Sequence, residues 1–169
     1  NPNNLIQTYN SPNFAGLTDT TYPDRLLDTR TTPHVYKLKF WSADTNELGD
    51  SDPASSIFLQ LAATDRRIAI SWTENVPWTN HSYVIFRRQG LTGNFIPLDT
   101  VVSNLYIDDS LANDSLYCYR IQSIGSYDSV VLADTLINYS QIECGVPIDT
   151  LPPCPPELTV TNNCDEIAD

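Results

Sequence analysis

Several short segments of this sequence alternate apolar and polar residues with a period of two. Residues 67–72 and 116–122 alternate most regularly. Further strands are predicted at residues 82–88, 94–98, 104–108 and around 138–144, with turn residues between them and no convincing amphipathic helix. The side chains predicted to be buried are Trp72, Tyr83, Ile85, Tyr119 and Ile121. Strands at this spacing without intervening helices predict an all-β, antiparallel sandwich.

An internal repeat divides the chain. Residues 21–24 and 34–38 match residues 105–108 and 117–121 at an offset of about 83 to 84 residues. After each match, a stretch rich in Pro and Ser or Cys leads into a strand, first near residue 57 and again near residue 157. The repeat predicts three parts: residues 1–58 as the C-terminal half of a module, 59–148 as a complete module, and 149–169 as a linker with the first strand of a following module.

An isolated half-sandwich would expose its inner face and unpaired strand edges, so residues 1–58 are not expected to fold alone. Either upstream sequence supplies the early strands, or a partner does; we favour the first.

The charge of the chain limits its partners. Twenty-one acidic residues against nine basic ones give a formal net charge of −12. Such a surface repels phosphate backbones and anionic lipids, so we expect no nucleic acid partner. No apolar run approaches the ~18 residues that span a bilayer, so we expect no membrane insertion.

The middle part of the chain resembles a fibronectin type III module. The resemblance lies in Trp72, Tyr83, Ile85 and the spacing from Leu111 to Tyr117. It implies fibronectin type III-like (immunoglobulin-like) antiparallel β-sandwich repeats, with Tyr117 as a tyrosine corner whose hydroxyl bonds nearby backbone. The first segment departs from the pattern, because His34 stands at the position of Tyr117.

Four segments resemble a more specific group of proteins: residues 72–78, 117–119, 136–140 and 152–156. Their sequences are similar to those of the repeated modules of large Bacteroidota cell-surface proteins, which are labelled gliding-motility-associated and exported by type IX secretion. The resemblance implies an extracellular scaffold or adhesin segment that contacts neighbouring modules of its own longer chain and surface or secretion-system proteins. The alternative is an accessory module of a secreted glycosidase or protease whose catalytic domain lies outside this chain.

The four cysteines lie in the last third of the chain and form no CxxC pair, which favours disulfides in an oxidising compartment. In the fold that the resemblance implies, Cys118 and Cys144 lie on neighbouring antiparallel strands, so we expect them to be bridged. Cys154 and Cys164 would lie about 30 Å apart along an extended strand. They pair with each other only if that segment folds back; otherwise, as we favour, their partners lie downstream.

Ten of the 16 Asp residues are followed by Ser or Thr, and seven of these ten have Val, Leu or Thr next. The seven hydroxyls are Thr20, Thr100, Ser110, Ser115, Ser129, Thr135 and Thr150. The pattern is similar to the acceptor motif of Bacteroidota O-glycosylation, which makes them candidate glycan sites in or near turns. Turn preference alone is the competing explanation, although it accounts for the Asp-Ser/Thr pairs and not for the apolar third residue.

The remaining candidate sites are weaker. Asp44, Glu47, Asp50 and Asp52 surround Gly49 and could attract Ca²⁺, although a solvated acidic turn fits them better. Trp78 could be a platform for sugar or protein, or could pack against a neighbouring module. Two histidines on unrelated segments make no catalytic arrangement, so we expect neither enzyme activity nor a cofactor.

Overall fold

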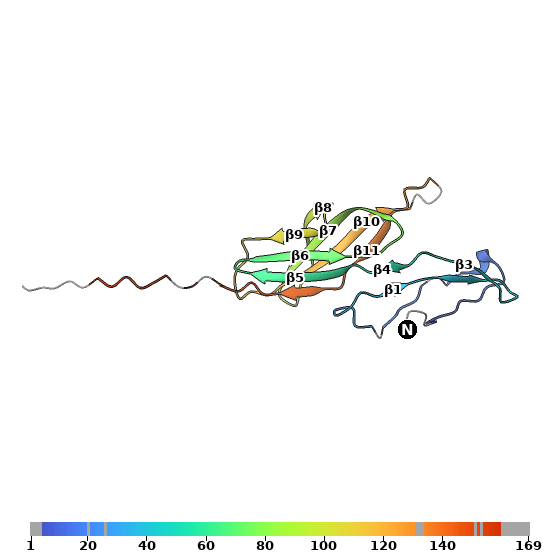
Figure 1. The fold of residues 1–169 in the computed structure, drawn as a ribbon, viewed down its shortest axis with the longest axis horizontal. Helices are drawn as coiled ribbons and strands as arrows, with labels where there is room; N and C mark the ends of the chain where they lie inside the picture. The colour runs from blue at the N-terminus through green and yellow to red at the C-terminus, as the bar shows by residue number, and fades with distance from the viewer. Residues whose placement is uncertain are drawn as a thin grey trace, which may run out of the picture.

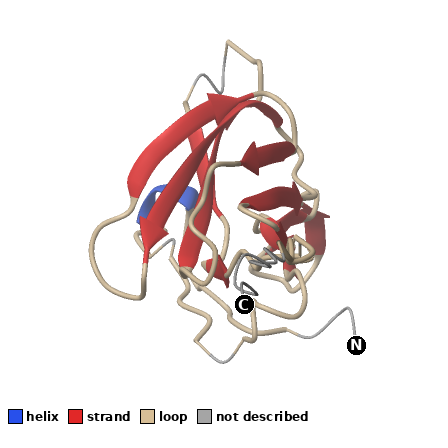
Figure 2. Cartoon of the chain, turned by 90° about the vertical axis from the view of Figure 1, so that its left-hand side faces the viewer, coloured by secondary structure: helices blue, strands red, loops and turns tan. Residues whose placement is uncertain are grey.

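A computed structural model describes residues 5–19, 21–25, 27–130, 134–150, 152 and 154–159. Nearly all of its regular structure is strand, and one short 3₁₀ helix, η1 (Phe14–Gly16), precedes the first strand (Figure 2). Within the described residues, no helix is long and apolar enough to cross a membrane.

The middle module is a sandwich of two antiparallel sheets (Figure 1). One sheet has the order β5 (Phe58–Thr64), β6 (Arg67–Thr73), β9 (Leu105–Asp108). In the other, β8 (Ile96–Val101) pairs with β7 (Thr79–Gln89), which pairs with β10 (Tyr117–Ser126). Beside β10 lie both β11 (Leu136–Tyr139) and β12 (Glu143–Gly145). This arrangement confirms the all-β, fibronectin type III-like fold class predicted from the sequence.

The core lies between the two sheets, where the alternating segments place their apolar side chains. In β6, Ile68, Ile70 and Trp72 are at most 2% exposed, while their neighbours along the strand are half-buried or exposed. The five side chains predicted to be buried are all in this core. Each large apolar side chain buried there stabilises the fold by about 1.5–3 kcal/mol. Ile57 is also buried, so the core of the middle module begins two residues before the predicted boundary at residue 59.

The strand expected around residues 138–144 is divided into β11 and β12, which corrects the prediction. Between the two, the hydroxyl of Ser140 accepts the backbone N–H of Ile121 at 2.9 Å, and the Ser140 N–H donates to the Ile121 carbonyl. The next side chain, Gln141, reaches the other sheet, where its amide bonds both the N–H and the carbonyl of Leu59. Side chains therefore replace backbone partners at the break and leave few polar groups unpaired.

Gly125 lies at a register shift between β10 and β7, where no side chain fits. A Cβ there would be 2.4 Å from the Thr79 carbonyl oxygen. We expect Gly125→Ala to lower the free energy of unfolding by about 1–3 kcal/mol, measured by urea denaturation. Gly145→Ala is the matched control, because its Cβ would come no closer than 3.4 Å to another atom. Equal stability of the two variants would contradict the close approach at Gly125.

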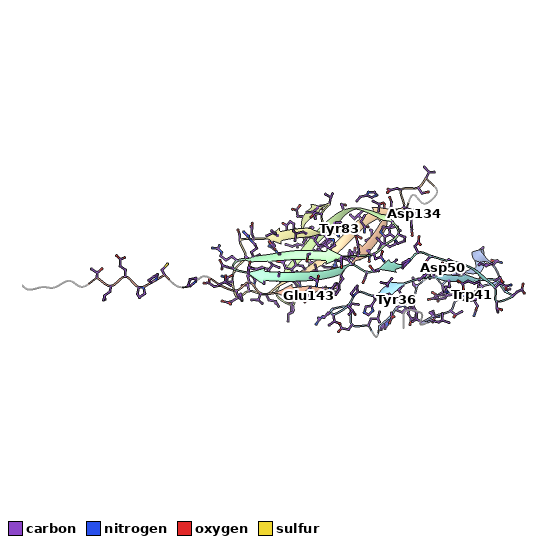
Figure 3. The ribbon with its side chains drawn as sticks, in the orientation of Figure 1. Tyr36, Trp41, Asp50, Tyr83, Asp134 and Glu143 are labelled. Atoms are coloured by element: carbon purple, nitrogen blue, oxygen red, sulfur yellow. A yellow bond between two sulfur atoms is a disulfide. The ribbon has the colours of Figure 1, made fainter. Side chains whose placement is uncertain are left out.

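The first segment makes two small antiparallel pairs. β1 (Val35–Tyr36) pairs with β4 (Ala54–Ser55), and β2 (Lys39–Trp41) pairs with β3 (Glu47–Asp50). Figure 3 labels Tyr36, Trp41 and Asp50 on this segment, apart from Tyr83 in the middle module. Its large apolar side chains are exposed: Val35, Tyr36, Leu38, Phe40, Trp41 and Leu48. Among the described residues before Ser55, none is buried.

At the other end, the described residues 154–159 have no regular secondary structure, although the sequence predicts the start of a further strand there. The rest of that predicted strand, from residue 160 on, lies outside the described residues.

Candidate functional site

The predicted disulfide is present. Cys118 of β10 lies directly opposite Cys144 of β12, and their sulfur atoms are bonded with the Cα atoms 4.0 Å apart. Cys118 is fully buried, between the inward-facing Tyr117 and Tyr119. The bridge closes a loop with a sequence separation of 26 residues and fixes the last strand to the sheet. Cys154 is an exposed free thiol, and Cys164 lies outside the described residues.

A buried ionic group joins the two sheets. Both carboxylate oxygens of Asp108 accept hydrogen bonds from Arg87 Nη1, at 3.0 and 2.9 Å, and Oδ2 also accepts the hydroxyl of Tyr119 at 2.7 Å. Asp108 is 5% exposed. Burial, together with the hydrogen bond to Asp108, raises the pKa of Tyr119 above its ordinary value. This ionic group was not predicted from the sequence. Its one sign there is that Asp108 lies two residues after Tyr106, and therefore on the same face of the strand.

Tyr117 has the geometry of a tyrosine corner. Its hydroxyl accepts the backbone N–H of Ala112 at 3.1 Å, five residues earlier. Leu111, at the start of this corner, is 3% exposed. The guanidinium of Arg87 lies 5.8 Å from the centre of the Tyr117 ring, so the corner and the buried ionic group support each other.

Trp78 is half-buried and makes its contacts within the middle module. Its ring meets that of Tyr127 edge-on at 6.1 Å, and its Nε1 donates to Asn80 Oδ1 at 3.0 Å. The carboxylate of Glu74 accepts both the Asn80 amide at 2.6 Å and the Tyr83 hydroxyl at 2.5 Å. Burial and the hydrogen bond to Glu74 raise the pKa of Tyr83 to about 12. We call these five residues the Trp78 cluster; they include three aromatic rings and two hydrogen-bonded polar side chains.

The outer face of the larger sheet carries a row of arginines and aromatic rings. The guanidinium of Arg120 lies 4.9–5.4 Å from the ring centres of Phe86, Phe95 and Tyr139, and Arg88 lies 4.6 Å from that of Phe95. The alternation of β10 predicts that Arg120 faces outward, but it does not predict its neighbours. In a strongly acidic protein, this row is a local basic and aromatic surface.

The acidic residues proposed for calcium are held by lysines or lie apart. Glu47 bonds Lys39 at 3.2 Å, and Asp50 forms an ion pair with Lys37. Among the described residues, no three acidic, histidine or cysteine side chains meet where a metal ion could be held.

The structure describes six of the seven candidate glycan sites, and Thr20 lies outside the described residues. Thr100, Ser110, Thr135 and Thr150 are exposed, while Ser115 and Ser129 are half-buried. Thr100 lies inside the edge strand β8 rather than in a turn. The hydroxyls are therefore distributed over the loops and one edge of the module, and they do not form one site.

A shallow cleft of about 390 Å³ lies where the first segment meets the middle module. Arg30 and Thr31 line it on one side, and Leu59, Leu61 and Glu143 are among the residues on the other. The cleft runs along the contact between the first segment and the middle module.

The comparisons with known proteins give no family for this chain. No protein-family model matches the chain, and the comparison with curated proteins gives no match. Among solved structures, the chain is similar to a fourth fibronectin type III domain of human origin, determined in solution. The similarity covers 69% of this chain and 100% of that domain, with 13% sequence identity and a TM-score of 0.39. The fold of this chain therefore rests on its own strand order and core.

Proposed function

We propose that this chain is a structural and adhesive scaffold segment of a secreted or cell-surface bacterial protein, and that it mediates protein or carbohydrate interactions without catalysis. The observation that carries the proposal is the repeat: one sandwich module follows part of a second unit with matching sequence. Arrays of repeated modules are typical of proteins that span distance and present surfaces, because each unit stacks on or links to the next.

Two further features support an extracellular scaffold. The Cys118–Cys144 bridge suits an oxidising compartment. The Trp78 cluster and the arginine–aromatic row offer aromatic rings beside polar or charged groups, which is the chemistry that sugars and protein loops bind. The likeness of residues 72–78 and 136–140 to repeated Bacteroidota surface modules favours export by type IX secretion.

The test uses the native host. An antibody raised against the folded middle module should label intact cells, and protease treatment of intact cells should remove the label. Deleting the residues of this chain from the full-length protein should reduce attachment of the cells to surfaces while leaving secreted hydrolase activities unchanged. Labelling that requires cell lysis would overturn the surface location. Loss of a secreted glycosidase or protease activity would favour the accessory-module alternative instead.

We also expect O-linked sugar at the seven candidate hydroxyls in protein purified from its native host. Glycopeptide mass spectrometry should find modified peptides that include Ser110, Ser115 and Thr135. The chain contains its own controls: Thr29, Thr45 and Ser51 also follow Asp but have no Val, Leu or Thr next, so they should be bare. Equal occupancy of both sets, or unmodified hydroxyls throughout, would leave turn preference as the explanation of the pattern.

A further inference from the structure

The strand pairs of the first segment have the same register as the last strands of the middle module. β1 and β2 together correspond to β10, and β3 and β4 correspond to β11 and β12. The matching pairs are Val35–Ser55 with Cys118–Cys144, and Lys39–Asp50 with Gln122–Tyr139. For the pairs from Val35–Ser55 to Phe40–Gly49, positions on the first strand precede their counterparts by 83 residues and positions on the second by 89. The shift changes by one residue only at Trp41–Glu47, beyond the irregularity in the β2–β3 register.

The break in the last strand is also repeated, with the same hydrogen bonds. Ser51, the counterpart of Ser140, accepts the N–H of Leu38 through its hydroxyl at 3.0 Å and donates its own N–H to the Leu38 carbonyl at 2.9 Å. Around Ser140 the equivalent distances, to Ile121, are 2.9 and 2.9 Å. A serine that replaces a strand hydrogen bond in two places at one register is not explained by two unrelated hairpins.

A third correspondence involves a residue that precedes the paired strands of each unit. The hydroxyl of Tyr36 donates to Asp24 Oδ2 at 3.2 Å, and that of Tyr119 donates to Asp108 Oδ2 at 2.7 Å. Tyr36 and Asp24 are the counterparts of Tyr119 and Asp108 in the repeat. The stretch around Asp24 therefore holds the place of β9, the strand that precedes the hairpin in the middle module.

The two units differ in how well their inner faces are covered. Tyr36, Leu38 and Phe40 are 39%, 65% and 49% exposed. Their counterparts in β10 all have an exposed fraction of 0%. In the middle module, β7 lies beside β10 in the same sheet, and β5 and β6 form the facing sheet. Among the described residues of the first segment, no strand takes the place of these neighbours, so its inner face belongs to an incomplete sandwich.

We propose that Tyr36, Leu38 and Phe40 form the docking face for two strands of the β5 and β6 type, supplied by the same polypeptide before Asn1. In the repeat unit the covering strands precede β9 and β10 in the chain, and a constant offset places the counterparts of β5 and β6 within about 30 residues before Asn1. A second copy of this chain fits less well, because its own β5, β6 and β7 already cover its middle module. This proposal is independent of the scaffold role.

The experiment compares this 169-residue chain with a chain that also carries the roughly 60 residues encoded before Asn1. Hydrogen–deuterium exchange at residues 36–40 should be slower in the longer chain by about a hundredfold or more, while exchange in β10 stays unchanged. Leu38→Asp should abolish that protection in the longer chain, whereas Leu48→Asp, at an exposed site on β3, should leave it intact.

Two outcomes would overturn the proposal. One is an upstream sequence without two alternating apolar strands, or one that leaves exchange at residues 36–40 unchanged. The other is protection of residues 36–40 that grows with concentration in the 169-residue chain, together with a dimer in analytical ultracentrifugation. That result would identify a second copy as the occupant.

Discussion

Replacing Arg87 with Met is expected to lower the free energy of unfolding of the middle module by about 3 kcal/mol. The substitution leaves the carboxylate of Asp108 buried without its cation, and removing one partner of a buried ion pair costs about 3–5 kcal/mol. The Arg87 side chain is 28% exposed, so the lower end of that range applies. Urea denaturation followed by the fluorescence of the buried Trp72 measures the loss directly.

The control is Lys39→Met, which removes the same charge from an ion pair that is far more open to water. Lys39 and Glu47 have side chains that are 48% and 40% exposed, and exposed pairs contribute about 0–1 kcal/mol. The double variant Arg87→Met/Asp108→Asn should recover part of the loss, because it leaves no buried charge unpaired. A loss for Arg87→Met no larger than that for Lys39→Met would show that the pair between β7 and β9 contributes little.

Removing the disulfide is expected to cost about 3.5 kcal/mol, the chain-entropy value for a loop of this length. The substitution Cys118→Val/Cys144→Ser is suited to the test, because Val35 and Ser55 occupy the same register in the first segment. Valine also fills the buried position of Cys118 with apolar volume, so little of the loss should come from a cavity.

A reductant supplies the second measurement. Dithiothreitol should lower the stability of the natural protein towards that of the double variant and leave the variant unchanged. A variant within about 1 kcal/mol of the oxidised protein would mean that the loop is already constrained in the unfolded chain.

The core strands could be predicted because their information is local. In β6 and β10, a period of two over seven or more residues determines which side chains face inward, and burial follows that pattern at Ile68, Ile70 and Ile121. Cys118 of β10 is the exception, because it is fully buried although the alternation places it on the outward side. The disulfide could be predicted once the order of the strands was known, because Cys118 and Cys144 lie on adjacent strands.

The other features depend on contacts between distant segments. Arg87 and Asp108 are 21 residues apart and meet only through the stacking of one sheet on the other. The break at Ser140 could not be predicted, because a side-chain oxygen there takes the place of a backbone carbonyl and the sequence pattern of a strand continues through it. The contact of Trp78 with Tyr127 could not be predicted for a similar reason, because it depends on the pairing of β7 with β10: Trp78 lies just before β7, and Tyr127 lies just after β10.

The contact between the first and last strands has a mechanical consequence. Ile57 and Ser140 form a parallel bridge, and two residues further along the first of these segments the Gln141 amide is hydrogen-bonded to the backbone of Leu59. Tension applied through the two ends of the module would slide these parallel segments past each other, so several hydrogen bonds must break together rather than one at a time. If these hydrogen bonds break, the Cys118–Cys144 disulfide still prevents the segment between the two cysteines from extending. That segment would otherwise add about 90 Å to the length of the stretched chain. A tether made of such modules would lengthen in smaller steps in oxidising surroundings than after reduction, and single-molecule stretching would resolve the difference.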